Sequence, residues 1–174
     1  MASLLTAGFP QLPVRHTYIA TTRYSKEVRA SLELGDTVYL HDSSVEVFIP
    51  DIGGVLVLET SLPSDSLAKL LSEYSLSAVE YVTYVVSCIS CYSVELSEVV
   101  SYIIDLACRD RCFNKIRTPR TGSLGREFIS GVRAGLSGCV SRECSGTLSL
   151  EVFGSTLCFG PVVYPGEAAT RVSM

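Results

Sequence analysis

The basic side chains of this 174-residue chain are concentrated in one segment, residues 109–143. This segment holds eight of the fourteen Lys and Arg residues but only three acidic residues, so its net charge is 8 − 3 = +5, whereas the whole chain carries −4. Clustered Lys and Arg are typical of surfaces that bind polyanions. We therefore expect an anion-binding surface here, although the overall pI of about 5.2 conceals it.

Within this segment a predicted strand, turn and helix carry the residues best suited to phosphate. Lys115 and Arg117 are two apart on a strand and so share a face. A helix starting near Ser123 would offer free backbone N–H groups and the positive end of its dipole. On that helix, Arg126 and Arg133 belong to one polar stripe with Ser130 and Ser137. The predicted contact residues are Lys115, Arg117, Arg120, Thr121, Ser123, Arg126 and Arg133.

Glycines and aromatic residues shape the same surface. Four glycines in this segment have no side chain to project from the surface, so we expect a ligand backbone to be able to approach the protein closely there. They are Gly122, Gly125, Gly131 and Gly135. The nearby aromatic residues, Phe113 and Phe128, fall on apolar faces. Phosphate contact is therefore expected more than base stacking.

No arrangement of residues is typical of a catalytic site. The only histidines, His16 and His41, are far from any motif. The segment around Gly122 and Gly125 lacks the Gly-Lys-Ser/Thr of a nucleotide phosphate loop, and no dinucleotide-binding fingerprint is present. We therefore expect a protein that is not an enzyme and that uses no cofactor and no metal.

Seven cysteines leave three interpretations open. They are Cys88, Cys91, Cys108, Cys112, Cys139, Cys144 and Cys158. The first four have the paired spacing of a four-thiolate zinc site. Disulfides such as Cys139–Cys144 are a second interpretation. An odd count without a signal peptide argues against a secreted disulfide framework, so we expect most of the thiols to be free packing residues.

Before residue 92 the expected elements alternate between strands and helices. Strands are predicted at 16–22, 45–49, 55–60 and 81–89 from their β-branched and aromatic residues. A first helix is predicted from Lys26 to about Gly35, and a second from about Ser64 through Tyr74 on apolar i, i+3, i+4, i+7 spacing. The resulting order, β-α-β-β-α-β, is the ferredoxin-like arrangement. The predicted fold class is α+β.

The second half continues with a helix over 94–111, a strand over 113–118, a helix over about 123–138 and a hairpin of strands at 148–153 and 156–163. Arg109 and Arg111 are expected to interact with the dipole at the end of the first of these helices. The predicted domains are an N-terminal arm (1–15), a ferredoxin-like domain (16–91), a small α/β domain (92–165) and a loose tail (166–174). No apolar run approaches the ~18–20 residues of a membrane span, and no leader is evident, so we expect a cytoplasmic protein.

In this organisation the chain resembles the THUMP family of RNA-binding modules. YIATTRYSKE (18–27) is similar to the first strand and helix of the ferredoxin-like domain that precedes the THUMP domain. GVLVLETSLP (54–63) is similar to its third strand and the start of its second helix. FNKIR (113–117), followed by Ser123 and a helix containing Gly131-Val132, resembles the core THUMP pattern. LEVF (150–153) resembles its penultimate strand.

The resemblance implies a protein that binds the acceptor stem and 3′ end of tRNA and presents the tRNA to a modification enzyme. Because the chain ends soon after the THUMP-like strands, it is similar to a stand-alone adaptor such as the one that assists tRNA cytidine acetylation. Its implied partners are tRNA and a tRNA-modifying enzyme, with no membrane. The family's basic surface falls on Lys115, Arg117, Arg120, Arg126 and Arg133. The alternative is a small-anion or nucleotide-binding regulatory module, by analogy with other ferredoxin-like units.

Overall fold

The computed structural model describes residues 14–74, 82–91, 95–109, 111–118, 125–153 and 156–164. These residues form a mixed α+β fold with one eight-stranded sheet and four α-helices. The strands are β1 (His16–Thr22), β2 (Glu46–Phe48), β3 (Val55–Thr60), β4 (Val82–Ser87), β5 (Ile89–Cys91), β6 (Lys115–Arg117), β7 (Thr147–Phe153) and β8 (Thr156–Tyr164). The helices are α1 (Glu27–Tyr39), α2 (Ser64–Tyr74), α3 (Leu96–Ile103) and α4 (Arg126–Gly135). A π-helical turn (Ile104–Cys108) continues α3, and a 3₁₀ turn (Ser137–Cys139) follows α4.

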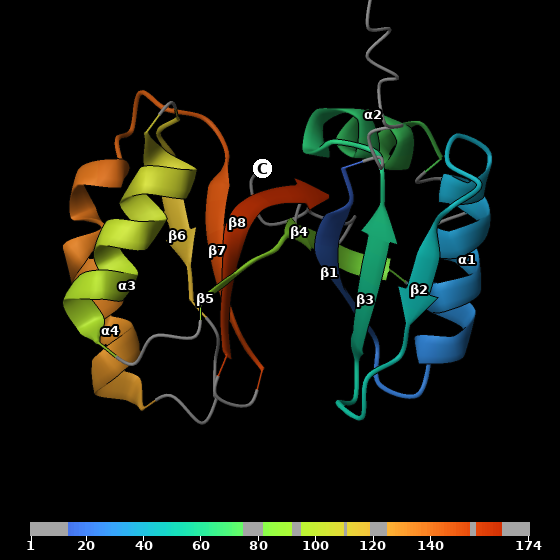
Figure 1. The fold of residues 1–174 in the computed structure, drawn as a ribbon, viewed down its shortest axis with the longest axis horizontal. Helices are drawn as coiled ribbons and strands as arrows, with labels where there is room; N and C mark the ends of the chain where they lie inside the picture. Colours follow the sequence, from blue (N-terminus) through green and yellow to red (C-terminus); the bar gives the residue numbers. More distant parts are fainter. Residues whose placement is uncertain are drawn as a thin grey trace, which may run out of the picture.

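The strand order is β2-β3-β1-β4-β8-β7-β6, and β5 pairs with β8 outside this path. All pairs are antiparallel except β6 with β7. Figure 1 shows α1 beside β2 and β3 at one end of the molecule and α3 with α4 beside β6 at the other. Strand β8 runs between the two ends (Figure 1).

Alternation along the strands of the first half places one face in a hydrophobic core. In β3, Leu56 and Leu58 are fully buried, while their neighbours along the strand are more exposed. They pack with Leu34 of α1 and Leu67 of α2, whose apolar residues recur at helical spacing. The predicted strand at 16–22 and the second helix are thereby confirmed. Helix α1 runs past Gly35, where it was expected to end, because Gly35 does not adopt the positive φ of a helix-ending glycine and Val38, one turn after Leu34, is buried in the same core.

A second core forms where α3 and α4 cover β6, β7 and β8. Its fully buried members include Ile103, Val132, Leu148 and Phe159. Packing of α3 against α4 is close. A Cβ on Gly131 would lie 2.7 Å from Leu96 Cδ2, and the equivalent atom on Gly135 would lie 2.7 Å from a methyl carbon of Val100. These two glycines were expected to admit a ligand backbone, but they admit helix α3 instead.

Strand β8 belongs to both cores. Its first half pairs with β5 and β7, and its end pairs with β4, where Tyr164 lies opposite Val85. The strand contributes Phe159 to the second core and Val163 with Tyr164 to the first. The apolar run predicted as one strand at 81–89 is therefore two strands, β4 and β5, which pair with different parts of β8.

The crossing between β4, β5 and β8 is tight at Gly160. A Cβ on this glycine would lie 2.0 Å from the carbonyl oxygen of Ser87, a backbone atom that no rotamer change can move. A disulfide joins Cys88 to Cys158 immediately beside the crossing, with a Cα–Cα distance of 5.3 Å. Only glycine fits here, and the covalent bridge holds the two strands together at the same place.

The remaining cysteines correct the sequence-based alternatives. A second disulfide joins Cys112 to Cys144, with a Cα–Cα distance of 5.6 Å. Cys139 is a buried free thiol, so the suggested Cys139–Cys144 bridge is wrong. The suggested zinc set is also wrong, because Cys88 and Cys112 are each committed to a disulfide. Spacing in the sequence could not show this, since each bridge joins segments that only the β8 and β7 pairings bring together.

Within the described segments, no helix has the length and apolar character needed to cross a membrane.

Replacing Gly160 by alanine should lower the free energy of unfolding by about 3 kcal/mol or more, because backbone must shift to relieve the contact with Ser87. Chemical denaturation of the two proteins would measure the difference. Gly138→Ala is the matched control, since a Cβ there meets no atom within 4 Å. Equal stabilities for Gly160→Ala and Gly138→Ala would contradict the crossing.

Candidate nucleic-acid interface

The two cations predicted on one strand do share a face of β6. Ile116 between them is buried in the second core. Lys115 and Arg117 therefore point to the opposite, helix-free face of the sheet. Lys115 is exposed, whereas Arg117 is half-buried. The predicted geometry is confirmed, but the two side chains differ in how freely they can meet a ligand.

Arg117 is held by a network of polar and aromatic groups. Its guanidinium pairs closely with the carboxylate of Glu151 and donates to Ser149 Oγ at 3.3 Å. Ser149, fully buried, donates to the same carboxylate at 2.8 Å. The parallel register of β6 and β7 sets up these contacts, because it places Arg117 opposite Ser149.

The other face of the guanidinium covers an aromatic ring. Arg117 Cζ lies 4.1 Å from the ring centre of Tyr84, although β7 and β8 separate their strands in the sheet. The two long side chains therefore meet across the strands that lie between them. Burial raises the pKa of Tyr84, Arg117 acts to lower it, and Glu151 acts to raise it. With its charge matched and its face stacked, Arg117 mainly joins strands rather than offering a free cation.

Helix α4 presents the second predicted group of cations. Val132 and Leu136 are buried, and on the opposite side of the helix Arg126 and Arg133 are exposed. Because they are seven residues apart, their side chains lie on the same face and about 10 Å apart along the axis. The helix begins at Arg126, after Gly125 as its N-cap, rather than near Ser123.

The structure does not bring the two groups onto one surface. Lys115 and Arg117 lie on the helix-free face of the sheet, whereas α4, with Arg126 and Arg133, covers the other face. The expected single curved surface across strand and helix is therefore not formed by these four side chains. Arg120, Thr121, Gly122 and Ser123 lie outside the described residues.

Ion pairs neutralise only some of the cations that the structure describes. Within the described part, Arg15, Lys69, Arg109 and Arg117 form ion pairs with carboxylates. Exposed cations without an ion pair among the described residues are Arg23, Arg111, Lys115, Arg126, Arg133 and Arg142. Five of these six fall within residues 111–142. The charge concentration seen in the sequence therefore persists as unneutralised charge on the folded surface.

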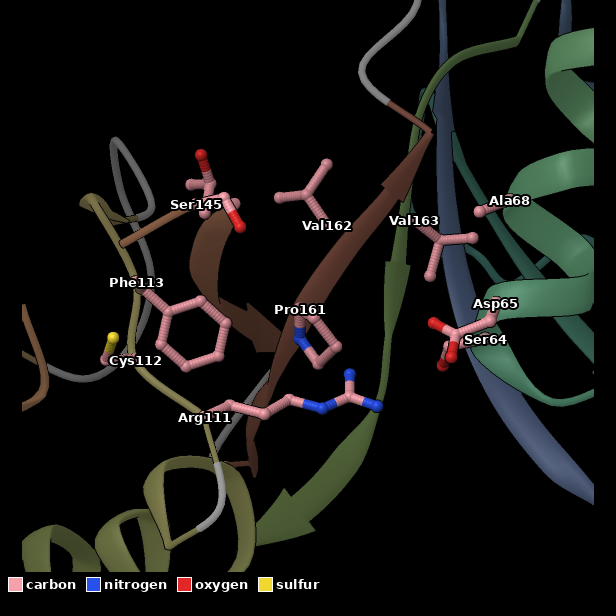
Figure 2. Close-up of a pocket in the computed structure, with 12 residues that line it drawn as sticks. Ser64, Asp65, Ala68, Arg111, Cys112, Phe113, Ser145, Pro161, Val162 and Val163 are labelled. Carbon is pink, nitrogen blue, oxygen red and sulfur yellow. The ribbon is translucent and has the colours of Figure 1, made fainter. Parts of the chain in front are cut away.

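Arg109 and Arg111 were both expected to interact with the dipole at a helix end, but in the structure they make different contacts. Arg109 pairs with Asp105 one turn back, with 3.5 Å between Nη2 and Oδ1. Arg111 lies beyond the π-helical turn and lines a cleft of about 420 Å³ between the two cores. Figure 2 shows its guanidinium extending from the Phe113 side toward Ser64 and Asp65 at the start of α2. No periodic pattern could have revealed this, because the cleft joins the two halves of the chain.

Pro161 and Val163 of β8 also line this cleft. Asp65 opposes the charge of Arg111 from the α2 side (Figure 2). The cleft thus has one cation and one carboxylate on facing walls, with apolar strand residues between them. Such a site suits a small polar ligand that carries both a donor and an anionic group.

No protein-family model and no curated protein matches this chain. Solved structures do share its fold. A predicted N6-adenine-specific DNA methylase from Listeria monocytogenes aligns over 86% of this chain and 40% of its own length, with 10% identity and a TM-score of 0.54. TrmN from Thermus thermophilus aligns over 84% and 45%, with 12% identity and a TM-score of 0.53. PH1313 from Pyrococcus horikoshii aligns over 84% and 54%, with 10% identity and a TM-score of 0.54.

This chain therefore spans about half the length of these structures or less. The similarity concerns the fold. It also corrects one expectation from the sequence, that the protein is not an enzyme, because the fold occurs within proteins named as methylases. The absence of a catalytic motif in the sequence was too weak a basis for that expectation.

Glu151→Gln should lower the free energy of unfolding by about 1–2 kcal/mol at neutral pH, because it leaves the half-buried Arg117 without its counter-charge. Glu73→Gln is the control. Its partner Lys69 is 79% exposed, so its loss should cost less than about 0.5 kcal/mol. Urea denaturation of both variants would decide, and equal losses would show that Arg117 is not held by Glu151.

Proposed function

We propose that this chain is an RNA-binding unit of a nucleic-acid-modification system and that tRNA is its ligand. The observation that carries the proposal is the set of five exposed cations between residues 111 and 142 that form no ion pair among the described residues. Lys and Arg that meet no carboxylate of the described residues can meet phosphates, with release of counterions from the RNA. The fold supports the same proposal, because it recurs in methylases.

The outer face of α4 is the centre of the proposed RNA surface. Arg126 and Arg133 are exposed there on one side of a helix whose opposite side is fixed in the core. A rigid helix holds two cations at constant spacing, which suits phosphate contacts that set the position of an RNA without reading its sequence. Lys115 on the other face of the sheet would contact a different part of the same RNA, around the β6 edge.

The proposal also includes the domain organisation and the tRNA region that the sequence resemblance to the THUMP family implies. We take residues 16–91 as a ferredoxin-like domain, supported by the antiparallel order β2-β3-β1-β4 with two helices, and residues 92–165 as a THUMP-like domain. Binding would engage the acceptor stem and 3′ end of tRNA in the cytoplasm. The sequence resemblance favoured acetylation, but the structural neighbours named as methylases favour methyl transfer as the reaction served.

Charge reversal on α4 tests the proposal. Arg126→Glu with Arg133→Glu should weaken tRNA binding roughly tenfold or more, and the slope of log K against log salt should become smaller by about two. Filter binding or fluorescence anisotropy across a salt series would measure both quantities.

The matched control for this experiment makes the same charge change in the first half, with Arg23→Glu and Lys69→Glu, both at exposed positions. That variant should bind tRNA almost as the unmodified protein does. If the two double variants lose affinity equally, general electrostatic attraction accounts for binding and the α4 surface does not.

The cleft at Arg111 favours a second candidate, a small-anion or nucleotide-binding module. A single guanidinium facing the start of α2 could hold one phosphate of a free nucleotide. Calorimetry with adenosine monophosphate would detect saturable binding that Arg111→Gln abolishes and that Arg142→Gln leaves intact. Binding of the nucleotide with no preference for tRNA would favour this candidate, and no heat of binding would eliminate it.

A further inference from the structure

Two short segments, residues 108–109 with 111–113 and residues 139–144, lie side by side where α3 and α4 end. The Phe113 N–H donates to the carbonyl of Cys139, and the Ser141 N–H donates to the carbonyl of Phe113, both at 2.9 Å. Phe113 and Val140 also form an isolated parallel bridge. Each segment carries two cysteines. The backbone pairing therefore brings two cysteine-bearing segments together.

One pair is oxidised and the other is reduced. Cys112 and Cys144 form a disulfide, whereas Cys108 and Cys139 are free thiols. The side chains of Cys108 and Cys139 are hydrogen-bonded to each other. Two thiols in contact, on segments already joined by backbone hydrogen bonds and one disulfide, need little movement to form a second bridge.

We propose that Cys108 and Cys139 are an oxidative modification site, which forms a second disulfide between the same two segments when the protein meets a small disulfide oxidant such as oxidised glutathione. This inference does not depend on the proposed RNA-binding function.

Exposure sets the order of the steps. Cys108 is half-exposed and Cys139 is buried, so the oxidant reaches Cys108 first. The Cys108 thiolate attacks one sulfur of the oxidant, which forms a mixed disulfide and releases one thiol. Cys139 then loses its proton and attacks the Cys108 sulfur, which releases the second thiol. Two electrons and two protons pass to the oxidant, which is reduced to two thiols.

The surroundings of Cys108 make this reaction slow near neutral pH. Burial, with the hydrogen bond to Cys139 adding to it, raises the pKa of the Cys108 thiol to about 12. Since only the thiolate is nucleophilic, little of the reactive form is present at pH 7. The bridge is therefore expected under prolonged or strong oxidation, and it would tie the π-helical turn after α3 to the 3₁₀ turn after α4.

Peptide mapping of the folded, full chain tests the proposal. Trypsin would place Cys108 in peptide 70–109 and Cys139 in peptide 134–142, apart from Cys112 in 112–115 and Cys144 in 143–171. The protein is incubated with oxidised glutathione at alkaline pH, alkylated under denaturing conditions and digested. Peptides 70–109, 112–115 and 143–171 are already joined by the two disulfides. Peptide 134–142 should be recovered free and alkylated before oxidation, linked to this joined set after it, and free again after reduction.

Two variants identify the partner, because peptide 70–109 also contains Cys88 and Cys91. Cys108→Ser should leave peptide 134–142 free after oxidation, whereas Cys91→Ser should leave the new linkage intact. The proposal is overturned if peptide 134–142 of the unmodified chain stays fully alkylated at saturating oxidant. It is equally overturned if the linkage persists in Cys108→Ser.

Discussion

The contact between Gly160 and the carbonyl of Ser87 is the constraint on which the rest of the structure depends. At this point β8 stops pairing with β5 and begins pairing with β4, so one strand serves two hydrophobic cores. Without that crossing, α1 and α2 would cover one sheet and α3 and α4 another. The Cys88–Cys158 disulfide lies beside the crossing and limits how far the two halves can separate in the unfolded chain.

The crossing also decides what the two halves can present to a ligand. It produces the cleft that Arg111 lines, since one wall belongs to α2 and the other to residues 111–113. Because β8 pairs with both β4 and β7, Arg117 of β6 and Tyr84 of β4 belong to one sheet, and the guanidinium reaches the ring across two intervening strands. Arg117, which was expected to be free for a ligand, therefore pairs with Glu151 and stacks on Tyr84. Arg111, which was expected to interact with a helix end, lines the cleft instead.

Local patterns predicted most of the individual elements. Helix α2 and strands β1, β3, β7 and β8 fall close to where alternation and helical spacing placed them. Long-range pairings were beyond such patterns. The division of the 81–89 run into β4 and β5, both disulfides and the Arg117–Glu151 pair all depend on which distant strands lie side by side. Gly131 and Gly135 illustrate the same limit, because a glycine that lowers a surface does not specify whether a ligand or a neighbouring helix fills the space.

For the candidate site, the sequence predicted the segment that carries the exposed basic residues, but it did not predict the contacts of individual residues such as Arg117 and Arg111. The block at 109–143 retains exposed and unpaired cations in the fold, but they lie on two faces of the sheet instead of one. An RNA that meets both groups must therefore curve around the β6 edge, whereas an RNA that meets only α4 would leave Lys115 in solvent. The neighbours named as methylases share the fold, and the chain covers less than half of the Listeria structure.

Ultraviolet cross-linking of tRNA to the folded chain, followed by mass spectrometry of the cross-linked peptides, tests the central claim most directly. The account predicts cross-links concentrated in residues 111–142, with the strongest on α4, and few on α1 or α2. Cross-links confined to α1, α2 or the β2–β3 edge would contradict it, because they would place the RNA away from the exposed cations of residues 111–142.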